Sequence, residues 1–142
     1  MNRVVISGIG VISCLGNDKQ EVLTSLKTSK SGLSINQDYI DNGMRCHVSG
    51  QVDPDLTTID RKMLRFMSET SAYAFLSTKE AIEDSGLSLE EISNNDVGVI
   101  VGSGTGSSRE LKNVVDTARE KGIKRVGPYA VTRTMGNTTS AA

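Results

Sequence analysis

Two apolar runs rich in β-branched residues stand out along this chain. The first, RVVISGIGVI, covers residues 3–12, and the second, VGVIVGSG, covers residues 97–104. Valine and isoleucine favour strands, and a short apolar run bounded by turn residues is typical of a buried strand. The pattern therefore predicts a buried strand at each of these two positions.

Segments with helical spacing follow the first run. Asn17 or Asp18 is expected to cap a helix over residues 19–30, and Asp60 to cap a longer helix over residues 61–85. Aspartate and asparagine side chains accept hydrogen bonds from the free amides of a first helical turn. The apolar positions of both segments recur at the spacing of one helix face.

Further helices are predicted toward the end of the chain. Ser88 and Glu91 have the spacing of a capping box for a short helix. Another helix should begin at Ser107 or Ser108 and end at Gly122, because glycine commonly closes a helix. The last stretch, YAVTRTMGNTTSAA, begins a helix of small residues.

The alternation of strands and helices predicts an α/β layered fold with a largely parallel sheet. Residues 33–59 show no strong period and should form an extended excursion with short strands, including RCHVSGQV. A stable sheet usually has more than two strands, and the chain stops on Ser140-Ala141-Ala142 without a signal that closes a helix. Both observations predict that this is part of a longer chain.

Composition and charge narrow the possible functions. Apolar residues make up 37% and charged residues 23% of the 142 residues, as in a soluble globular domain. The net charge of −1 gives no general attraction for nucleic acid or anionic lipid, so a charged partner must meet a local patch. No run is long enough to span a membrane. We therefore expect neither nucleic acid nor a membrane as a partner.

Cysteine and histidine are scarce in this chain. Cys14 and Cys46 are its only cysteines and His47 its only histidine, too few for a disulfide framework or a tetrahedral zinc site. We expect no metal, two free thiols and a cytoplasmic location. A nucleophile also needs an adjacent base, and on a strand His47 would point away from Cys46. The residues alone therefore indicate no catalytic site.

Two glycine-rich segments could in principle bind a nucleotide. After Gly8 and Gly10, Ser13 stands where a dinucleotide loop needs its third glycine, and residues 28–34 lack the carboxylate that would bind the ribose. We expect these glycines to let the strand lie close to a neighbouring backbone. The second segment, GSGTGSS at residues 102–108, lacks the lysine of a phosphate loop. A tight turn that lines a ligand cavity and a phosphate site both remain open for it.

Five segments of the chain resemble one family, the β-ketoacyl-[acyl-carrier-protein] synthases, and type I in particular. They are RVVISGIGVISCLGN, GMRCHVSG, IDRKMLRFMSETSAYAFLSTKEAIEDSGL, VGVIVGSGTGS and VGPYAVTRTM, and together they extend from Met1 almost to Ala142. The resemblance implies a thiolase fold, of which residues 1–142 would be an incomplete N-terminal part.

The resemblance also implies a reaction, the decarboxylative Claisen condensation of an acyl thioester with malonyl on its carrier protein. Family members use a cysteine nucleophile and two histidines and need no cofactor. Cys14 and His47 match none of these positions, so the catalytic residues would lie beyond Ala142. We therefore expect this chain to be inactive by itself.

Three features carry over from the family to positions of this sequence. The resemblance places a docking surface for the acidic acyl carrier protein on Lys62 and Arg65, with Arg61 beside them, and on the matching positions Lys121 and Lys124, to which Arg125 is an added neighbour. It places Thr105 at the end of the acyl-chain pocket. It also places Met135 where one subunit reaches the acyl pocket of its partner, which implies a homodimer. Because Thr105 and residues 136–138 depart from the commonest type I pattern, the preferred acyl chain length stays open.

Alternatives remain beside this interpretation. Within the fold, a thiolase or a polyketide ketosynthase would carry similar segments, and a preference for coenzyme A or for a carrier protein would separate them. Outside it, the chain could be a non-catalytic α/β interaction module, or a nucleotide-binding module that holds a phosphate at residues 102–108.

Overall fold

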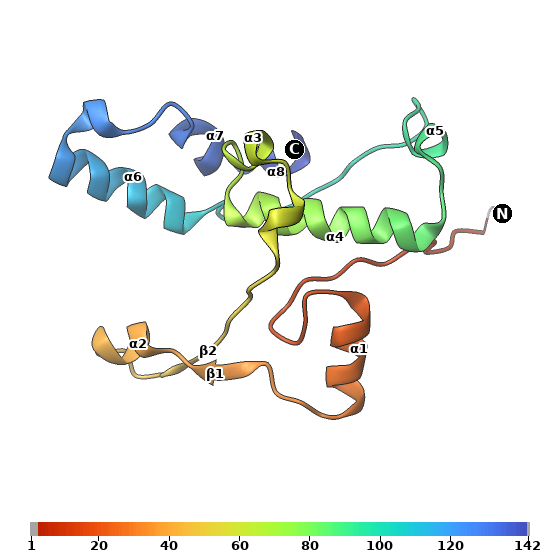
Figure 1. Ribbon diagram of the computed structural model, residues 1–142, viewed down its shortest axis with the longest axis horizontal. Coiled ribbons are helices and arrows are strands. Elements are labelled where there is room, and N and C mark those ends of the chain that lie inside the picture. Colours follow the sequence, from red (N-terminus) through yellow and green to blue (C-terminus); the bar gives the residue numbers. More distant parts are fainter. Residues whose placement is uncertain (1–2, 142) are drawn as a thin grey trace. The chain divides into compact units, whose positions relative to one another are not determined.

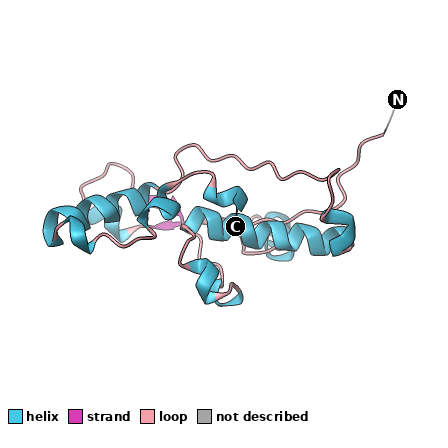
Figure 2. Ribbon diagram, turned by 90° about the horizontal axis from the view of Figure 1, so that it is seen from above, coloured by secondary structure: helices cyan, strands magenta, loops and turns pink. Residues whose placement is uncertain are grey.

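The computed structural model describes residues 3–141 (Figure 1). By its internal contacts the chain divides into two compact units, Met1–Pro54 with Leu76–Leu87, and Asp55–Phe75 with Ser88–Ala142. Helix α4 (Glu69–Ser85) contributes residues to both units. The described chain is mostly helix and loop, with one pair of short strands (Figure 2).

The first unit contains two short helices and this strand pair. Its elements, besides the second half of α4, are α1 (Lys19–Lys27), β1 (Leu33–Ile35), α2 (Gln37–Asp41) and β2 (Val48–Gly50). The strands are antiparallel, with Leu33 opposite Gly50 and Ile35 opposite Val48. The short strands predicted within residues 33–59 are thus present, but the stretch is only partly extended, because Gln37–Asp41 and Leu56–Thr58 are helical.

Helix α1 begins where the sequence predicts and ends earlier. The Asp18 side chain accepts a hydrogen bond from the Glu21 amide at 2.8 Å, which makes Asp18 the N-cap. The helix stops at Lys27, before the predicted end at residue 30. Ser29 lies in the left-handed region at φ 55°, a conformation that interrupts a right-handed helix.

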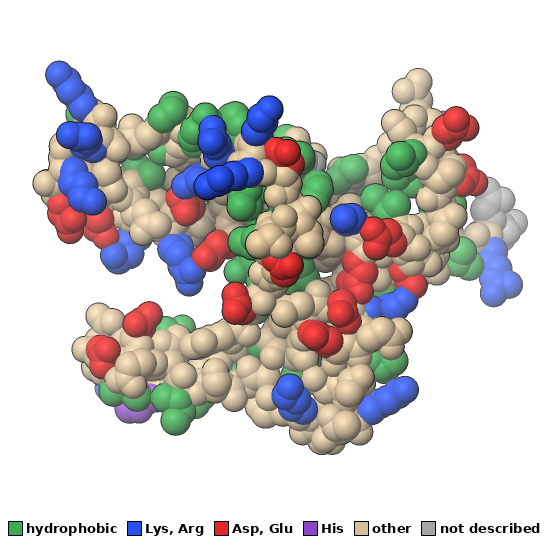
Figure 3. Space-filling view, viewed as in Figure 1, with side chains coloured by type: hydrophobic (Ala, Val, Ile, Leu, Met, Phe, Trp, Pro, Cys, Tyr) green, Lys and Arg blue, Asp and Glu red, His purple; other side chains and the backbone are tan. Residues whose placement is uncertain are grey.

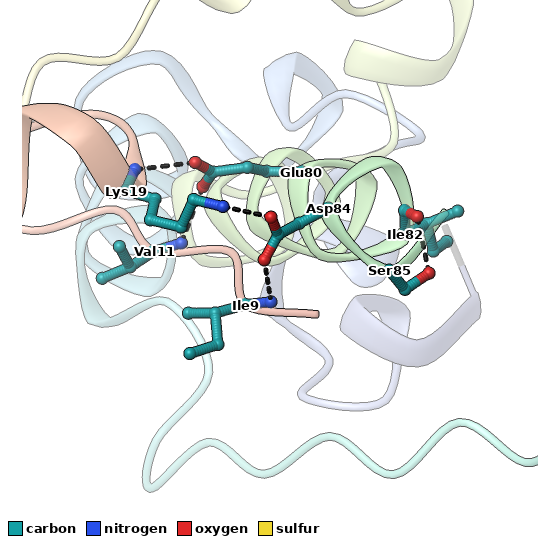
Figure 4. Close-up of polar contacts among 7 residues, drawn as sticks. All are labelled: Ile9, Val11, Lys19, Glu80, Ile82, Asp84 and Ser85. Carbon is teal, nitrogen blue, oxygen red and sulfur yellow. Dashed lines mark hydrogen bonds and ion pairs between the residues drawn. The ribbon is translucent and has the colours of Figure 1, made fainter. Parts of the chain in front are cut away.

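The prediction of a buried strand over residues 3–12 is wrong for this structure. The segment is extended but pairs with no strand, and much of its apolar surface is exposed. Its amides instead bond to carboxylates on α4. The Ile9 amide donates to Asp84 at 3.0 Å, and the Val11 amide donates to Glu80 at 2.8 Å (Figure 4).

Glu80 and Asp84 also hold the start of α1. The second carboxylate oxygen of Glu80 accepts the Lys19 amide at 2.7 Å, and the Lys19 ammonium pairs with Asp84 (Figure 4). The two carboxylates are four residues apart and so share one face of α4. They join α4, the N-terminal segment and α1 within the first unit.

The glycines of the first run allow this close approach. Gly8 lies against the backbone carbonyl of Ala81, and Gly10 against that of Ser77, with no space at either position for a Cβ atom. The predicted close approach to a neighbouring backbone is confirmed, although that backbone belongs to a helix.

The second unit is built from short helices around the first half of α4. They are η1 (Leu56–Thr58), α3 (Arg61–Leu64), α5 (Leu89–Ile92), α6 (Ser108–Lys121), η2 (Ile123–Arg125), α7 (Ala130–Thr134) and α8 (Thr138–Ala141). The predicted capping box of Ser88 and Glu91 is present, and Ser107 caps α6. The hydrogen bonds from Ser88 lower the pKa of Glu91. Gly122 ends α6 as predicted, at φ 86°.

The long helix predicted over residues 61–85 is interrupted. Asp60 caps α3, but this helix ends at Leu64 and α4 begins at Glu69. The Ser68 hydroxyl accepts the Ser71 amide at 3.2 Å, in the way that an N-cap side chain does, and so starts a new helix.

The predicted largely parallel sheet is also absent from residues 3–141. Residues 97–104 form no strand, and Ile100 is 99% exposed. A strand forms only where a second backbone supplies hydrogen-bond partners. For the described residues, that condition is met only at β1 and β2 and at an isolated bridge between Ser13 and Gly16.

Hydroxyl groups form much of the buried interior of the second unit. Its buried apolar side chains are Ile59, Met67 and Ala72. Ser71, fully buried, lies 3.2 Å from the Ser68 hydroxyl and 3.3 Å from that of Thr139. These contacts join the start of α4 to α8.

No helix among residues 3–141 has the length and apolar character needed to cross a bilayer.

The carboxylate contacts predict an acid-sensitive attachment of the N-terminal segment. The hydrogen bonds that the Asp84 carboxylate accepts from the Lys19 ammonium and from the Ile9 amide hold its pKa below the ordinary value of 3.8. Because the pKa of Asp84 is lower in the folded protein, the contact stabilises the fold at neutral pH, and this stabilisation is lost as the pH falls from the ordinary carboxyl pKa through the lowered pKa of Asp84. We expect the protection of the Ile9 amide from hydrogen exchange, corrected for the intrinsic exchange rate, to disappear over this acidic range.

Asp84→Ala should remove this protection already at neutral pH, and Glu80→Ala should do the same for Val11. Glu83→Ala is the matched control, because its exposed side chain lies on α4 outside these contacts. Protection of Ile9 in Asp84→Ala and of Val11 in Glu80→Ala as strong as in Glu83→Ala would show that the carboxylates do not hold the segment.

Candidate functional site

All eight predicted site residues lie in the second unit. Thr105 belongs to the glycine-rich loop between residues 97 and 107, and its side chain is exposed. The next residue, Gly106, has a φ of 62°, which side-chain-bearing residues rarely adopt. Two hydrogen bonds hold it: its amide donates to Ser103 Oγ at 3.1 Å, and its carbonyl accepts from Thr70 Oγ1 at 3.3 Å.

This loop lies against the end of α7. A Cβ atom on Gly106 would be 3.1 Å from the Thr134 carbonyl oxygen and 3.6 Å from Gly136 Cα. Thr105 and Met135, the two residues predicted to line the acyl pocket, are the direct sequence neighbours of this contact. The structure therefore brings the two predicted pocket segments together.

Local hydrogen bonds set the path of the chain around Met135. The Thr134 hydroxyl donates to the Ala130 carbonyl at 3.0 Å, within α7. The Thr138 hydroxyl donates to the Thr132 carbonyl at 2.6 Å and so folds residues 135–137 back onto α7. Met135 itself is 44% exposed.

The six predicted docking cations occupy two places. Arg61 and Lys62 are in α3 and Arg65 follows it, whereas Lys121 ends α6 and Lys124 and Arg125 belong to η2. All six side chains are exposed, and none takes part in an ion pair among residues 3–141. Figure 3 shows positive side chains gathered over α3 and again at the end of α6. We call these the α3 cations and the α6 cations.

Three residues near the α3 cations were not predicted from the sequence. Phe66 and Tyr129 pack edge to face, with ring centroids 4.7 Å apart at 74°. Arg133 in α7 donates from Nε to the Arg65 carbonyl at 3.0 Å. All three stand in segments that carry the family resemblance, but only their tertiary contacts distinguish them from their neighbours.

An open pocket of about 540 Å³ lies in the first unit. Its lining includes Cys14, Glu21, Lys30 and Asp53, and none of the predicted site residues. Cys14 is half-buried against Gly32 and Gly50, whereas Cys46 is exposed. No group of three or more metal-ligating side chains comes together within residues 3–141.

Comparison with known structures identifies the fold. A solved beta-ketoacyl synthase from Burkholderia phymatum superposes with a TM-score of 0.80 at 26% sequence identity, over 99% of this chain and 36% of that one. The described residues thus form a part of the ketosynthase fold, mostly helical and with a small antiparallel strand pair.

Sequence comparison identifies the family. The family model "Beta-ketoacyl synthase, N-terminal domain" matches residues 1–142. Two curated relatives are named 3-oxoacyl-[acyl-carrier-protein] synthase 1. The one from Escherichia coli is 51% identical over 99% of this chain, and the one from Haemophilus influenzae is 46% identical over 99%. The chain belongs to the beta-ketoacyl synthase family and matches its N-terminal domain. It spans 36% and 35% of the length of these two relatives.

Proposed function

We propose that residues 1–142 are the N-terminal part of a condensing enzyme of fatty-acid synthesis, a 3-oxoacyl-[acyl-carrier-protein] synthase. The observation that carries the proposal is the match of the whole chain to the family domain, with 46% and 51% identity to two synthases of this name. The proposed enzyme joins an acyl group to malonyl carried on the acyl carrier protein.

The proposed reaction divides the labour between this part and the rest of the enzyme. The acyl group first moves from its thioester to a cysteine sulfur. Malonyl then loses CO₂, the resulting carbanion attacks the acyl carbonyl carbon, and the cysteine sulfur leaves as a thiolate. The family resemblance assigns the cysteine and two histidines to positions that Cys14 and His47 do not match. Residues 1–142 therefore supply recognition surfaces and no catalytic residue.

The first recognition surface is the docking face for the carrier protein, made of the α3 cations and the α6 cations. They are exposed and form no ion pair among residues 3–141, which leaves their charge available to an acidic protein. Complementary charge of this kind accelerates encounter and sets orientation. Both relatives are named as synthases of a 3-oxoacyl group on the acyl carrier protein, which supports this choice of partner.

The second recognition surface is the end of the acyl pocket, where Thr105 of one subunit would lie with Met135 of the partner subunit. Glycines on both sides of Thr105 allow a ligand to approach the backbone closely. The contact of Gly106 with Thr134 places the loop beside the segment of Met135. We further propose a homodimer in which Met135 reaches the acyl pocket of the partner subunit.

The docking face predicts a salt-dependent affinity. In the full-length enzyme, Lys62→Glu with Arg65→Glu should weaken binding of the acyl carrier protein about tenfold and flatten its dependence on salt, because exposed pairs are each worth ~0.2–1 kcal/mol and are screened by ions. The measurement is a binding titration at several salt concentrations.

Lys27→Glu with Lys30→Glu is the matched control, because it reverses two exposed charges that belong to the first unit and to neither group of cations. If the two double variants bind the carrier protein equally well at low salt, the α3 cations are only a solvated surface.

Thr105 should limit the length of the acyl chain in the full-length enzyme. A β-branched side chain is stiff at χ1 and cannot easily move aside. Thr105→Gly should shift acyl loading toward longer chains and Thr105→Ile toward shorter ones, by about fourfold per carbon, since a buried methylene is worth ~0.8 kcal/mol. Competition among acyl-carrier substrates of stepped length measures the shift.

Thr105→Val is the control for this prediction, because it keeps the shape of the side chain and should keep the length profile. An unchanged profile in the glycine and isoleucine variants would place the end of the pocket elsewhere.

The division of labour predicts that the polypeptide of residues 1–142 releases no CO₂ from malonyl-carrier substrate above the uncatalysed rate, while the full-length enzyme does. Radiolabelled malonyl-carrier protein provides the assay. Turnover by the short polypeptide would contradict the assignment of the catalytic residues to the remainder of the enzyme.

A further inference from the structure

Arg133 contacts the two elements that carry the groups of docking cations, the end of α3 and the start of α6. It lies in α7, and its guanidinium reaches two neighbouring elements at once. Nε donates to the Arg65 carbonyl oxygen at 3.0 Å, and Nη1 lies 3.7 Å from a carboxylate oxygen of Glu110. Only 37% of the Arg133 side chain and 20% of the Glu110 side chain are exposed.

Each of these contacts leads to one group of cations. The Arg65 carbonyl belongs to the residue that ends α3, so this hydrogen bond fastens the α3 cations to α7. Glu110 lies in the first turn of α6, whose other end carries the α6 cations. A planar guanidinium with several donors in fixed directions can set such a spacing, whereas a flexible ammonium holds only one point.

The surroundings of Arg133 restrain the same junction. Phe66, the residue after Arg65, packs edge to face on Tyr129, which precedes α7. The start of α6 is tied to the start of α4 by an ion pair between Arg109 and Glu69. Because these contacts remain when Arg133 is replaced, loss of the Arg133 contacts would loosen the spacing between α3 and α6 without unfolding either helix.

We propose that Arg133 is a positioning residue for carrier-protein docking, which sets the spacing between the α3 cations and the α6 cations through Arg65 and Glu110. The inference rests on the proposed function. Arg133 acts through these two residues and does not itself need to touch the carrier protein. A partner that binds both groups of cations requires them at a constant separation, so the spacing contributes to affinity and to the choice of partner.

Glu110→Gln tests this role by the sign of its effect. If charge alone mattered, the removal of an acid close to the docking face would strengthen the binding of an acidic carrier protein. If Glu110 holds Arg133 in place, the same substitution weakens binding. Glu120→Gln is the matched control, because it removes the same charge from α6 at an exposed residue that forms no ion pair within residues 3–141.

The experiment compares the full-length enzyme with its Glu110→Gln, Glu120→Gln, Arg133→Lys and Arg133→Gln variants. We expect about threefold weaker carrier binding for Glu110→Gln, as the loss of a partly exposed ion pair implies. Glu120→Gln should bind as well as the unaltered enzyme or better. Arg133→Lys, which keeps the charge, should lie between the unaltered enzyme and Arg133→Gln.

Steady-state kinetics separate positioning from a general loss of structure. Glu110→Gln should raise KM for the carrier-bound substrate and leave kcat unchanged. Turnover of the same acyl group on pantetheine, which does not use the docking face, should not change. Binding by Glu110→Gln as tight as by Glu120→Gln, or an equal loss with both substrates, would overturn the positioning role.

The charge-reversal variant Lys62→Glu with Arg65→Glu distinguishes this inference from the proposed function. If that variant binds the carrier protein normally, the docking face is wrong and the role of Arg133 fails with it. If that variant binds weakly while Glu110→Gln and Arg133→Lys bind normally, the docking face stands and only the positioning role fails.

Discussion

Hydrogen bonds from otherwise unpaired backbone amides to two carboxylates of α4 organise the first unit. Backbone donors need partners in a folded protein, and the extended N-terminal segment has no strand beside it within the described residues. Glu80 accepts the amides of both Val11 and Lys19, and Asp84 accepts that of Ile9. The same contacts thus place the first apolar run and the start of α1. Removal of either carboxylate would leave these amides to water, because the contact of Ile9 with Asp84 is exposed and that of Val11 with Glu80 only part-buried, and the segment would lose its attachment to α4.

The second unit depends on small hydroxyl side chains in a similar way. Ser71 is fully buried and contacts Ser68 and Thr139, so the first turn of α4 is joined to α8 by hydroxyl groups. Thr70, in the same turn, donates to the Gly106 carbonyl and holds the loop that carries Thr105. Hydrogen bonds have narrow preferred directions, and short side chains lose little freedom when ordered. The candidate pocket loop is therefore positioned by directional contacts more than by a large apolar core.

Separation of recognition from catalysis is the functional theme of the proposal. The family chemistry needs a cysteine and two histidines, and residues 1–142 offer instead a cationic surface and a loop beside α7. Under the proposal, docking and selection of chain length would vary by substitutions in this part while the reacting groups remain unchanged. Arg133 illustrates the point, because its contacts to Arg65 and Glu110 join elements without any role in bond formation.

The sequence by itself predicted the features that depend only on neighbouring residues. The caps at Asp18, Ser88 and Ser107 act within a few residues, and each forms as expected. The motifs also identified the family, which the comparisons confirm. Only the tertiary structure decided that residues 3–12 bond to a helix, that Ser68 separates α3 from α4, and that Arg133 reaches Arg65. A cap needs only its own neighbours, whereas a strand or a side-chain contact needs a partner whose position depends on the whole fold.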